Sequence, residues 1–296
     1  MRLSTYKKES IMNKIQLKLT IFVLVSLILI VSCGNNKPSD KINAMTHNIR
    51  TWSNYKECTP QRIDNLMSER KIDILGTQEL HIQQINDIDS LLENYNWFGV
   101  ARDDGKEDGE FCAIFYNNKT LELKENDTFW LSETPSEAGS RSWNTACTRI
   151  VTWGKFKVKS SGNIFYHFNT HFDHRSDLAR EESAKLLRRM IIEKVNQKPV
   201  VITGDFNFTP DSDPYNIVTA KDDKLSLFDS KKITLQQPLG SEGTSNSFEE
   251  LNPTRRIDYI FVNDLTEVKT YEVINEKYKD EFISDHFPVH AKIELK

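Results

Sequence analysis

The hydrophobic pattern of the chain consists of short apolar runs that end in polar side chains. The clearest run is Val200-Val201-Ile202, and its unbroken apolarity predicts a strand that is covered on both faces. Gly204 then permits a tight turn, which brings Asp205 and Asn207 to the exit of this strand. Because α/β proteins keep their chemistry at the carboxyl ends of buried strands, the stretch is a candidate site. The alternative is that Asp205 only caps a turn.

The same pattern divides the rest of the chain into strands and amphipathic helices. Helices are predicted over 62–70, 82–92 and 178–195, the last capped by Asp177. Asn117-Asn118 predicts a hairpin turn between the strands that flank it. Residues 209–250 are polar and are assigned no element. Besides the central run, strands are predicted over 43–50, 72–79, 111–116, 121–131, 149–158, 164–170, 256–262 and 284–293. The mixture predicts one α/β domain over 44–296, with sheets packed face to face and helices outside.

The start of the chain has the pattern of an export signal. Residues 20–31 form an apolar run after Lys14 and Lys18, too short to span a bilayer comfortably but suited to a signal peptide. Ser32-Cys33 follows and resembles the bacterial lipoprotein box, in which the cysteine is lipidated. We therefore expect residues 1–32 to be a lipoprotein signal peptide, starting at Met1 or Met12. Residues 33–43 would be a lipidated, polar tether to the lipid bilayer, with the protein facing the periplasm or the cell exterior. An uncleaved anchor is the alternative, and it too implies export.

Charge and cysteine usage narrow the class of protein. The net charge is −4, and residues 1–32 hold five of the 39 basic and one of the 43 acidic residues, so the remainder carries −8. This acidity argues against a nonspecific nucleic-acid binder. Besides Cys33 there are Cys58, Cys112 and Cys147, which show no zinc-like spacing. We expect Cys112 and Cys147 to be buried thiols, although an oxidising compartment would allow one disulfide.

Polar residues follow four of the apolar strands, and we expect them to converge. They are Asn48, Glu79, Asp205 with Asn207, and Asp285 with His286. Hard oxygen ligands of this kind suit Mg²⁺ or Mn²⁺ rather than zinc. A divalent ion beside an imidazole suits phosphoryl chemistry, because the ion neutralises phosphate charge while the histidine handles a proton. Each residue taken alone would more often be a turn residue, a surface charge or a structural histidine.

The order of these motifs resembles the endonuclease/exonuclease/phosphatase superfamily, the deoxyribonuclease-I-like group. The motifs run from 45 to 289 and are Met45-Thr46-His47-Asn48-Ile49-Arg50, Gln78-Glu79, Asn169-Thr170-His171-Phe172-Asp173-His174, Gly204-Asp205-Phe206-Asn207, Arg256-Ile257-Asp258-Tyr259-Ile260-Phe261 and Ser284-Asp285-His286-Phe287-Pro288-Val289. The resemblance implies a four-layer α/β sandwich, two β-sheets face to face with helices outside. It also implies a metal-dependent phosphohydrolase site at one end.

The resemblance also assigns roles. Asn48, Glu79 and Asp285 would surround the Mg²⁺ or Mn²⁺ ion, with Glu79 as principal ligand. His286 would act as general base or stabilise the phosphate, and Asp258 would orient it. Asp205 would orient or deprotonate the attacking water, and which of Asp205 and His286 takes the proton stays open. Asn207 and His171 would hold phosphate oxygens, and Arg149 matches an arginine that reaches phosphate in some members. His47, His81, His167, His174 and His290 receive no role.

The substrate is left open by the family. We expect Arg102, Glu110, Trp143 and Asn144 to line the substrate mouth, because polar and aromatic loop residues beside a rigid site commonly do so. Core packing is the alternative for the aromatic residue. The acidic stretch 102–110 would repel a nucleic-acid backbone, so a monomeric phosphoesterase for a small phosphate ester, or for a phosphorylated glycan or lipid headgroup, is favoured. A nuclease, or a binding lipoprotein without catalysis, is the alternative.

Overall fold

Two β-sheets lie face to face in the computed structural model, which describes residues 40–51 and 57–296. The first sheet has the strand order β10-β12-β13-β1-β2-β4-β3. Its strands are β1 (Lys41–Asn48), β2 (Ile74–Gln78), β3 (Tyr95–Phe98), β4 (Ile114–Asn117), β10 (Leu239–Gly240), β12 (Thr266–Val273) and β13 (Val289–Leu295). The second sheet has the order β5-β6-β7-β8-β11-β9. Its strands are β5 (Leu121–Trp130), β6 (Ile150–Val158), β7 (Ile164–His171), β8 (Val200–Asp205), β9 (Leu227–Asp229) and β11 (Asp258–Asn263).

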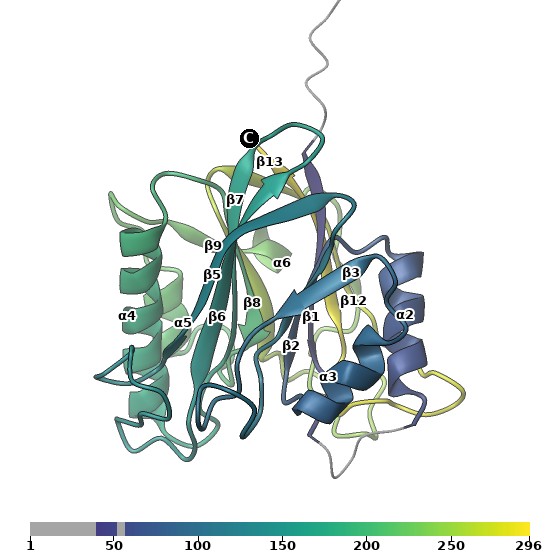
Figure 1. Ribbon diagram of the computed structural model, residues 1–296, viewed down its shortest axis with the longest axis horizontal. Helices are drawn as coiled ribbons and strands as arrows, with labels where there is room; N and C mark the ends of the chain where they lie inside the picture. The colour runs from purple at the N-terminus through teal and green to yellow at the C-terminus, as the bar shows by residue number, and fades with distance from the viewer. Residues whose placement is uncertain (1–39, 52–56) are drawn as a thin grey trace, which may run out of the picture. The chain divides into compact units, whose positions relative to one another are not determined.

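Helices cover the outer faces of both sheets. The first sheet carries α2 (Thr59–Glu69) and α3 (Ile82–Asp89), and the second carries α4 (Asp177–Lys194) and α5 (Asp213–Val218), on opposite sides of Figure 1. The short α6 (Ser230–Ile233) follows β9 and contacts both β11 and β12. These layers are those of the predicted four-layer α/β sandwich, which is confirmed. Within the described part of the chain, no helix is long and apolar enough to cross a membrane.

Alternating side chains explain why the strands are apolar throughout. Successive residues of a strand point to opposite faces, so a strand between two layers needs an apolar side chain at nearly every position. In β1, Ala44 joins the cluster between the sheets, whereas Met45 joins the cluster under α2 and α3. In β8, Val201 faces the other sheet and Ile202 faces α4 and α5. The fold thus has three apolar layers, and any slip of β1 or β8 by one residue would exchange their faces.

Parallel pairing places the carboxyl ends of β1 and β2 at one edge of the first sheet, and those of β7 and β8 at one edge of the second. The strands β1 and β2 are parallel and joined through α2, and β7 and β8 are parallel and joined through α4. A parallel connection needs such a crossover, which returns the chain to the same end of the sheet. The β6–β7 pair is antiparallel and is joined by residues 159–163.

Several details of the sequence prediction were wrong. The expected hairpin at Asn117-Asn118 does not form, because this turn carries the chain from β4 in the first sheet to β5 in the second. The cap of α4 is Ser176, whose side chain accepts a hydrogen bond from the Ala179 N–H, and not Asp177. The last strand begins at Val289 rather than 284, which leaves Asp285 and His286 on a loop. Cys58, Cys112 and Cys147 are free thiols, and of these only Cys112 is buried, so the expected burial of Cys147 was wrong. Cys33, the expected signal and residues 33–39 of the expected tether lie outside the described residues, whereas residues 41–43 belong to β1.

Candidate active site

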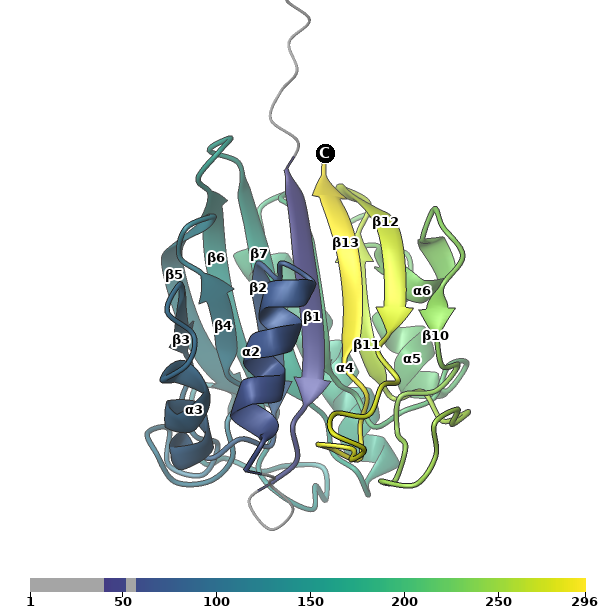
Figure 2. The same ribbon diagram turned by 90° about the vertical axis from the view of Figure 1, so that its right-hand side faces the viewer.

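Strand register places five predicted site residues at one edge of the two sheets. Asn48 is the last residue of β1, opposite Gln78 of β2, and Glu79 follows directly. In the second sheet, Asp205 of β8 stands opposite both His171 of β7 and Asp258 of β11. Since the two sheets are packed together, the ends meet at the lower edge in Figures 1 and 2. The convergence of these five residues therefore follows from strand register within each sheet and from the packing of the two sheets.

Asn48 joins two carboxylates across the sheets. Its fully buried amide nitrogen donates to Glu79 Oε1 at 2.9 Å and to Asp205 Oδ2 at 3.0 Å. Its own Oδ1 accepts from the backbone N–H of Arg50 at 3.1 Å. A buried amide with all these partners has one orientation, so Asn48 fixes the spacing of the two acids.

Glu79 is held ionised. Its backbone has a φ of +65°, uncommon for a residue with a Cβ, and this turns the side chain toward the sheet edge. Burial raises the pKa of Glu79, but the hydrogen bond from Asn48 and the positive charge of Arg50 outweigh it, so the pKa lies below its usual value. The Thr51 N–H donates to Oε2 at 3.1 Å, and Arg50 Nη1 lies 3.7 Å from the same oxygen.

Asp258, His286 and Asp205 form a charged row. His286 Nδ1 and Asp258 Oδ2 are 2.9 Å apart, and His286 Nε2 lies 3.9 Å from Asp205 Oδ2. Burial alone would lower the pKa of His286, but the charges of Asp258 and Asp205 and the hydrogen bond to Asp258 raise it to about 10. Burial and the nearby Asp258 charge raise the pKa of Asp205 to about 7. The imidazole is therefore a cation near neutral pH, while Asp205 is the acid that changes charge there.

Asn207 and His171 stand next to Asp205. Asn207 has a φ of +50°, and its side-chain nitrogen lies 3.0 Å from His171 Nε2 and donates to the carbonyl of Phe172 at 3.1 Å. His171 Nε2 is 3.4 Å from Asp205 Oδ2. Burial, together with the positive charges of Arg149 and Arg102, lowers the pKa of His171 well below its usual value. His171 is thus a neutral imidazole, in contrast to His286.

The oxygen-rich side of the site fits a hard divalent cation. Asp285 Oδ1 is buried without a hydrogen-bond donor among the described residues, and Oδ2 lies 3.4 Å from Arg50 Nη1. Arg50 thereby places its positive charge between Glu79 and Asp285. Glu79 and Asp285, which share the Arg50 guanidinium as a positively charged partner, are hard oxygen donors of the kind that Mg²⁺ or Mn²⁺ prefers. Glu79 with His171 and Asp205 forms a second group with ligand atoms within 4.8 Å of one another.

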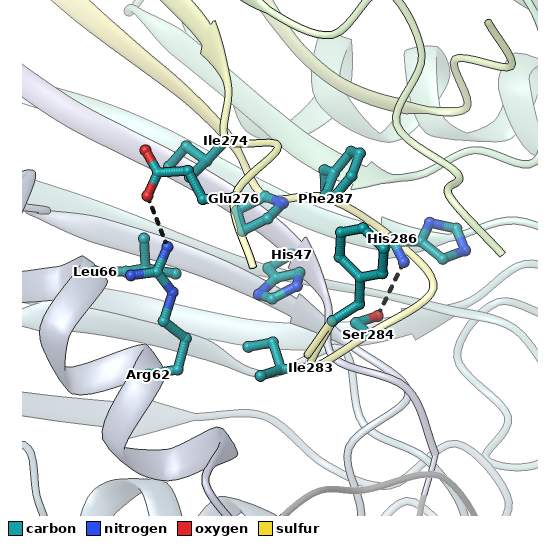
Figure 3. A pocket seen from close by; sticks show the side chains of 11 residues that line it. His47, Arg62, Leu66, Ile274, Glu276, Ile283, Ser284, His286 and Phe287 are labelled. Carbon is teal, nitrogen blue, oxygen red and sulfur yellow. Dashed lines mark hydrogen bonds and ion pairs between the residues drawn. The ribbon is translucent and has the colours of Figure 1, made fainter. Parts of the chain in front are cut away.

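Hydrogen bonds of Ser284 hold the loop before β13 in place. Ser284 Oγ donates to the Asn48 carbonyl at 2.6 Å, which ties the loop to β1. The same oxygen accepts from the His286 N–H at 3.1 Å (Figure 3). His47 lies beneath, in a pocket that it shares with Arg62, and burial lowers its pKa to about 3. The neutral ring lines this small pocket together with Ser284 and His286.

A cavity of about 470 Å³ opens above these residues. Asn48 and Asp258 lie behind its wall. The described residues that line it are Arg50, Thr51, Glu79, Arg102, Glu110, Cys147, Arg149, His171, His174, Asp205, Asn207, Ser245, Ser247, Arg255, Ile257, Asp285 and His286. The volume is that of a small-molecule site.

The four residues of the expected substrate mouth divide into two pairs. Arg102 and Glu110 line the cavity, whereas Trp143 and Asn144 are not among its described lining residues. Trp143 packs against the apolar layer under α4, and its carbonyl accepts a hydrogen bond from Ser176 Oγ at 2.8 Å. The alternative interpretation of the aromatic residue, core packing, therefore describes its surroundings.

Sequence reasoning missed several basic residues of the cavity. Arg50 and Arg255 line it without having been selected, and so does His174, whose Nδ1 lies 3.1 Å from Arg149 Nη2. Arg50 stands two residues after Asn48 and His174 three after His171, and this proximity to strong motifs was the available signal. Their contacts, Arg50 with Asp285 and His174 with Arg149, join residues far apart in the sequence, which local patterns do not encode.

Comparison with known proteins agrees with this geometry. A family model described as the endonuclease/exonuclease/phosphatase family matches residues 45–286. A solved endonuclease/exonuclease/phosphatase from Bacteroides vulgatus is 35% identical, with a TM-score of 0.80 over 86% of this chain and 99% of that one. The mannosyl-6-phosphatase Bt3783 of Bacteroides thetaiotaomicron is 33% identical, with a TM-score of 0.77 over 85% of this chain and 99% of that one.

A curated relative extends the similarity beyond solved structures. Carbon catabolite repressor protein 4 homolog 5 of Arabidopsis thaliana is 28% identical over 201 residues, which are 62% of this chain and 41% of that protein. The chain thus spans less than half the length of the curated relatives it matches. The family model covers most of the chain, and together with these likenesses it establishes that the chain belongs to the endonuclease/exonuclease/phosphatase family.

Proposed function

We propose that this chain is an exported, lipid-tethered phosphoesterase that uses Mg²⁺ or Mn²⁺ and acts as a monomer. The observation that carries the proposal is one cavity in which Glu79 and Asp285 face Asp205 and His286. Glu79, Asp285 and Asn48 would hold the ion. When bound, the ion supplies neutralisation of phosphate charge and a fixed position for a phosphate oxygen.

The charge states of His286 and Asp205 favour a different role for each of them in the reaction. His286 is a cation whose Nδ1–H is engaged by Asp258, so its Nε2–H is free to stabilise negative charge on the phosphate. Asp205 has a pKa of about 7, which suits a base that accepts a proton from the attacking water near neutral pH. This favours Asp205 as the base. Arg149, His171 and Asn207 would hold the remaining phosphate oxygens.

The size and charge of the cavity favour a small phosphate ester. A volume of about 470 Å³ suits a single phosphorylated small molecule. The exposed acids Asp103, Asp104, Glu107 and Asp108 lie in the loop beside it and would repel a nucleic-acid backbone. The likeness to a mannosyl-6-phosphatase, with 99% of that chain covered, supports a phosphorylated sugar as the substrate class.

A nuclease is the second candidate. Arg50, Arg102, Arg149 and Arg255 all line the cavity, and arginines are the usual partners of a phosphate backbone. Binding to DNA or RNA that weakens steeply with salt would favour this candidate, since each neutralised phosphate releases counterions.

The test is a substrate panel assayed on the full chain extracted in detergent. Phenyl phosphate, bis(p-nitrophenyl) phosphate, hexose 6-phosphates, DNA and RNA would each be incubated with Mg²⁺, Mn²⁺ or EDTA. We expect metal-dependent turnover of a monoester, reduced about 10²–10⁴-fold in Asp205→Ala. Asp177→Ala, an exposed acid on α4, is the matched control and should behave as the wild type. Turnover of nucleic acid alone would select the second candidate, and turnover of nothing would favour a binding protein.

A further inference from the structure

The loop between β3 and β4 is built to present two side chains to the cavity. The Arg102 N–H donates to the Glu110 carbonyl at 3.0 Å, and the Asp103 N–H donates to the Asp108 carbonyl at 3.1 Å. Asp104 Oδ1 accepts from the N–H groups of Lys106 and Asp108, which closes the tip of the loop. These hydrogen bonds hold Arg102 and Glu110, the first and last residues of the segment 102–110, side by side.

Two further contacts anchor this loop to the fold. Trp130 of β5 donates from its indole nitrogen to the Arg102 carbonyl at 2.6 Å. Gly109 has a φ of +95°, and a Cβ there would lie 2.4 Å from Asp103 Oδ2, so only glycine fits. The loop is therefore a rigid part of the site rather than a mobile rim.

Arg102 and Glu110 form a mostly buried ion pair in the wall of the cavity. Arg102 Nη1 lies 2.5 Å from Glu110 Oε2, and the side chains are only 14% and 18% exposed. Glu110 Oε1 and Arg102 Nε make no hydrogen bond within the described part of the chain. Arg102 and Glu110 line a small pocket of about 10 Å³ together with Glu79, Arg149 and His171. The pair thus lies next to the predicted metal ligand and still has hydrogen-bonding capacity.

The order of strands places this pair opposite the proton-handling groups. In the first sheet β13, β1, β2 and β4 are neighbours in that order. His286 precedes β13 and Glu110 precedes β4, so Asn48 and Glu79, at the ends of β1 and β2, lie between them. In a phosphoryl transfer the attacking and leaving oxygens are roughly in line on opposite sides of phosphorus. Water activated near Asp205 and His286 would therefore expel a leaving group toward Arg102 and Glu110.

We propose that Arg102 and Glu110 form a clamp for neighbouring hydroxyl groups of the leaving alcohol, which makes the substrate a phosphomonoester of a sugar or another polyol. This inference rests on the proposed function. The water oxygen bonds to phosphorus, the bond between phosphorus and the sugar oxygen breaks, and that oxygen keeps the electron pair. One proton of the water ends on the sugar oxygen and the other on the released phosphate.

The chemistry of the pair suits a diol. A carboxylate accepts hydrogen bonds from hydroxyl groups, and a guanidinium donates to hydroxyl oxygens in a fixed, planar geometry. A buried site that is built to bind a hydroxyl discriminates strongly against an analogue without it, because its own polar groups are then left unpaired. The clamp therefore predicts a preference between leaving groups rather than a general effect on phosphate hydrolysis.

The test compares a hexose 6-phosphate with phenyl phosphate, whose leaving group has no further hydroxyl. Glu110→Gln keeps the shape of the side chain and removes its charge. We expect its kcat/KM for the hexose phosphate to fall at least 30-fold, mainly through KM, and this fall to be at least tenfold larger than that for phenyl phosphate. Glu107→Gln, an exposed acid in the same loop, is the matched control and should change neither value. Arg102→Lys is the second variant and should show the same selective loss, and it decides the matter if Glu110→Gln fails to fold.

The outcomes separate the clamp from the proposed function. Equal losses on both substrates, or no loss on the hexose phosphate, would overturn the clamp. A wild type that hydrolyses phenyl phosphate with metal but shows no preference for sugar phosphates would overturn the clamp and leave the phosphoesterase standing. If the wild type hydrolyses no ester, the proposed function fails. Calorimetric binding of the hexose 6-phosphate then decides, since equal affinity in wild type and Glu110→Gln would overturn the clamp as well.

Discussion

At the scale of single residues, two histidines of one site carry opposite charges for opposite reasons. His286 has Asp258 and Asp205 beside it, which raise its pKa to about 10, whereas His171 faces Arg149 and Arg102, which join burial in lowering its own. Both rings are buried, so the charged neighbours decide the outcome. The site thus offers a cationic and a neutral imidazole a few ångströms from the same carboxylate, that of Asp205.

Asp258→Asn should lower the pKa of His286 by at least one unit in metal-free protein, because the largest favourable interaction of the imidazolium is removed. Activity should fall about 10–100-fold, as is usual when the partner that orients a functional histidine is lost. NMR titration of the His286 ring gives the first result, and kcat/KM gives the second. The pH dependence of the free energy of unfolding gives a third result, an independent measure of the His286 pKa.

The raised pKa of His286 determines how the free energy of unfolding changes with pH. A histidine whose folded pKa is raised above 6.5 stabilises the protein below pH 6.5, and this contribution is lost as the pH rises through about 10. The fall should reach a few kcal/mol in wild type, at about 1.4 kcal/mol per pKa unit, and be smaller in Asp258→Asn. Asp264→Asn, at the exposed opposite end of β11, is the control. A His286 pKa that stays near 10 in Asp258→Asn would contradict the assignment of its cause.

Some site residues could be identified from the sequence because they lie at the ends of strands. Glu79 and Asp205 follow apolar runs that can be read locally, and the register of β1 with β2 and of β7 with β8 brings these residues together. Arg50 could not be identified in this way, because its position between Glu79 and Asp285 depends on the loop before β13, more than 230 residues later. Long-range contacts of this kind carry no local pattern.

At the scale of elements, errors in the predicted strands have physical causes. In β12 the buried positions are Thr266, Val268, Tyr271 and Val273, because a bulge between Val268 and Thr270 breaks the alternation, and the strand was missed. The strand β3 has only four residues, none of them buried, and so lacks the apolar run that marks a strand. The turn at Asn117-Asn118 was identified correctly as a turn, but a turn signal does not say whether the next strand joins the same sheet.

One buried ion pair fixes the strand that carries Asp258. Arg256 donates to Asp229 Oδ1 at 3.1 Å and to Oδ2 at 2.6 Å, and the two side chains are 6% and 1% exposed. Tyr215 also donates to Asp229 Oδ2, and Asp229 caps α6. The pair therefore joins β9 and α6 to the start of β11, two residues before Asp258.

Arg256→Ala should destabilise the protein by about 3–5 kcal/mol, because it leaves the buried Asp229 carboxylate without its cation. Urea unfolding measures the change. Lys124→Ala on β5, which removes an ion pair with Glu122 that is more than 40% exposed on each side, should cost no more than about 1 kcal/mol. A loss below about 1 kcal/mol in Arg256→Ala would mean that the pair contributes no more than a surface ion pair.

At the scale of the whole molecule, the chain enters the fold at the end remote from the site. The strand β1 begins at Lys41 and ends at Asn48 (Figure 2), which at about 3.3 Å per residue separates the two ends by about 23 Å. Asp40 is already part of the structure, since its carbonyl accepts a hydrogen bond from the Leu295 N–H. Whatever precedes Asp40 is thus attached to the domain far from the cavity.

Loss of the lipid tether should therefore change where the protein is found without changing what it does. Cys33→Ser is expected to move the protein from the membrane fraction to the soluble fraction, because the proposed lipid provides the hydrophobic attachment. A chain that starts at Asp40 should keep kcat/KM within about twofold of the detergent-extracted full chain, because all of the lining residues of the cavity follow it. Membrane fractionation and mass measurement of the mature N-terminus check the first expectation, and the substrate panel checks the second. A wild-type protein that keeps residues 1–32 attached would instead identify this segment as an uncleaved anchor.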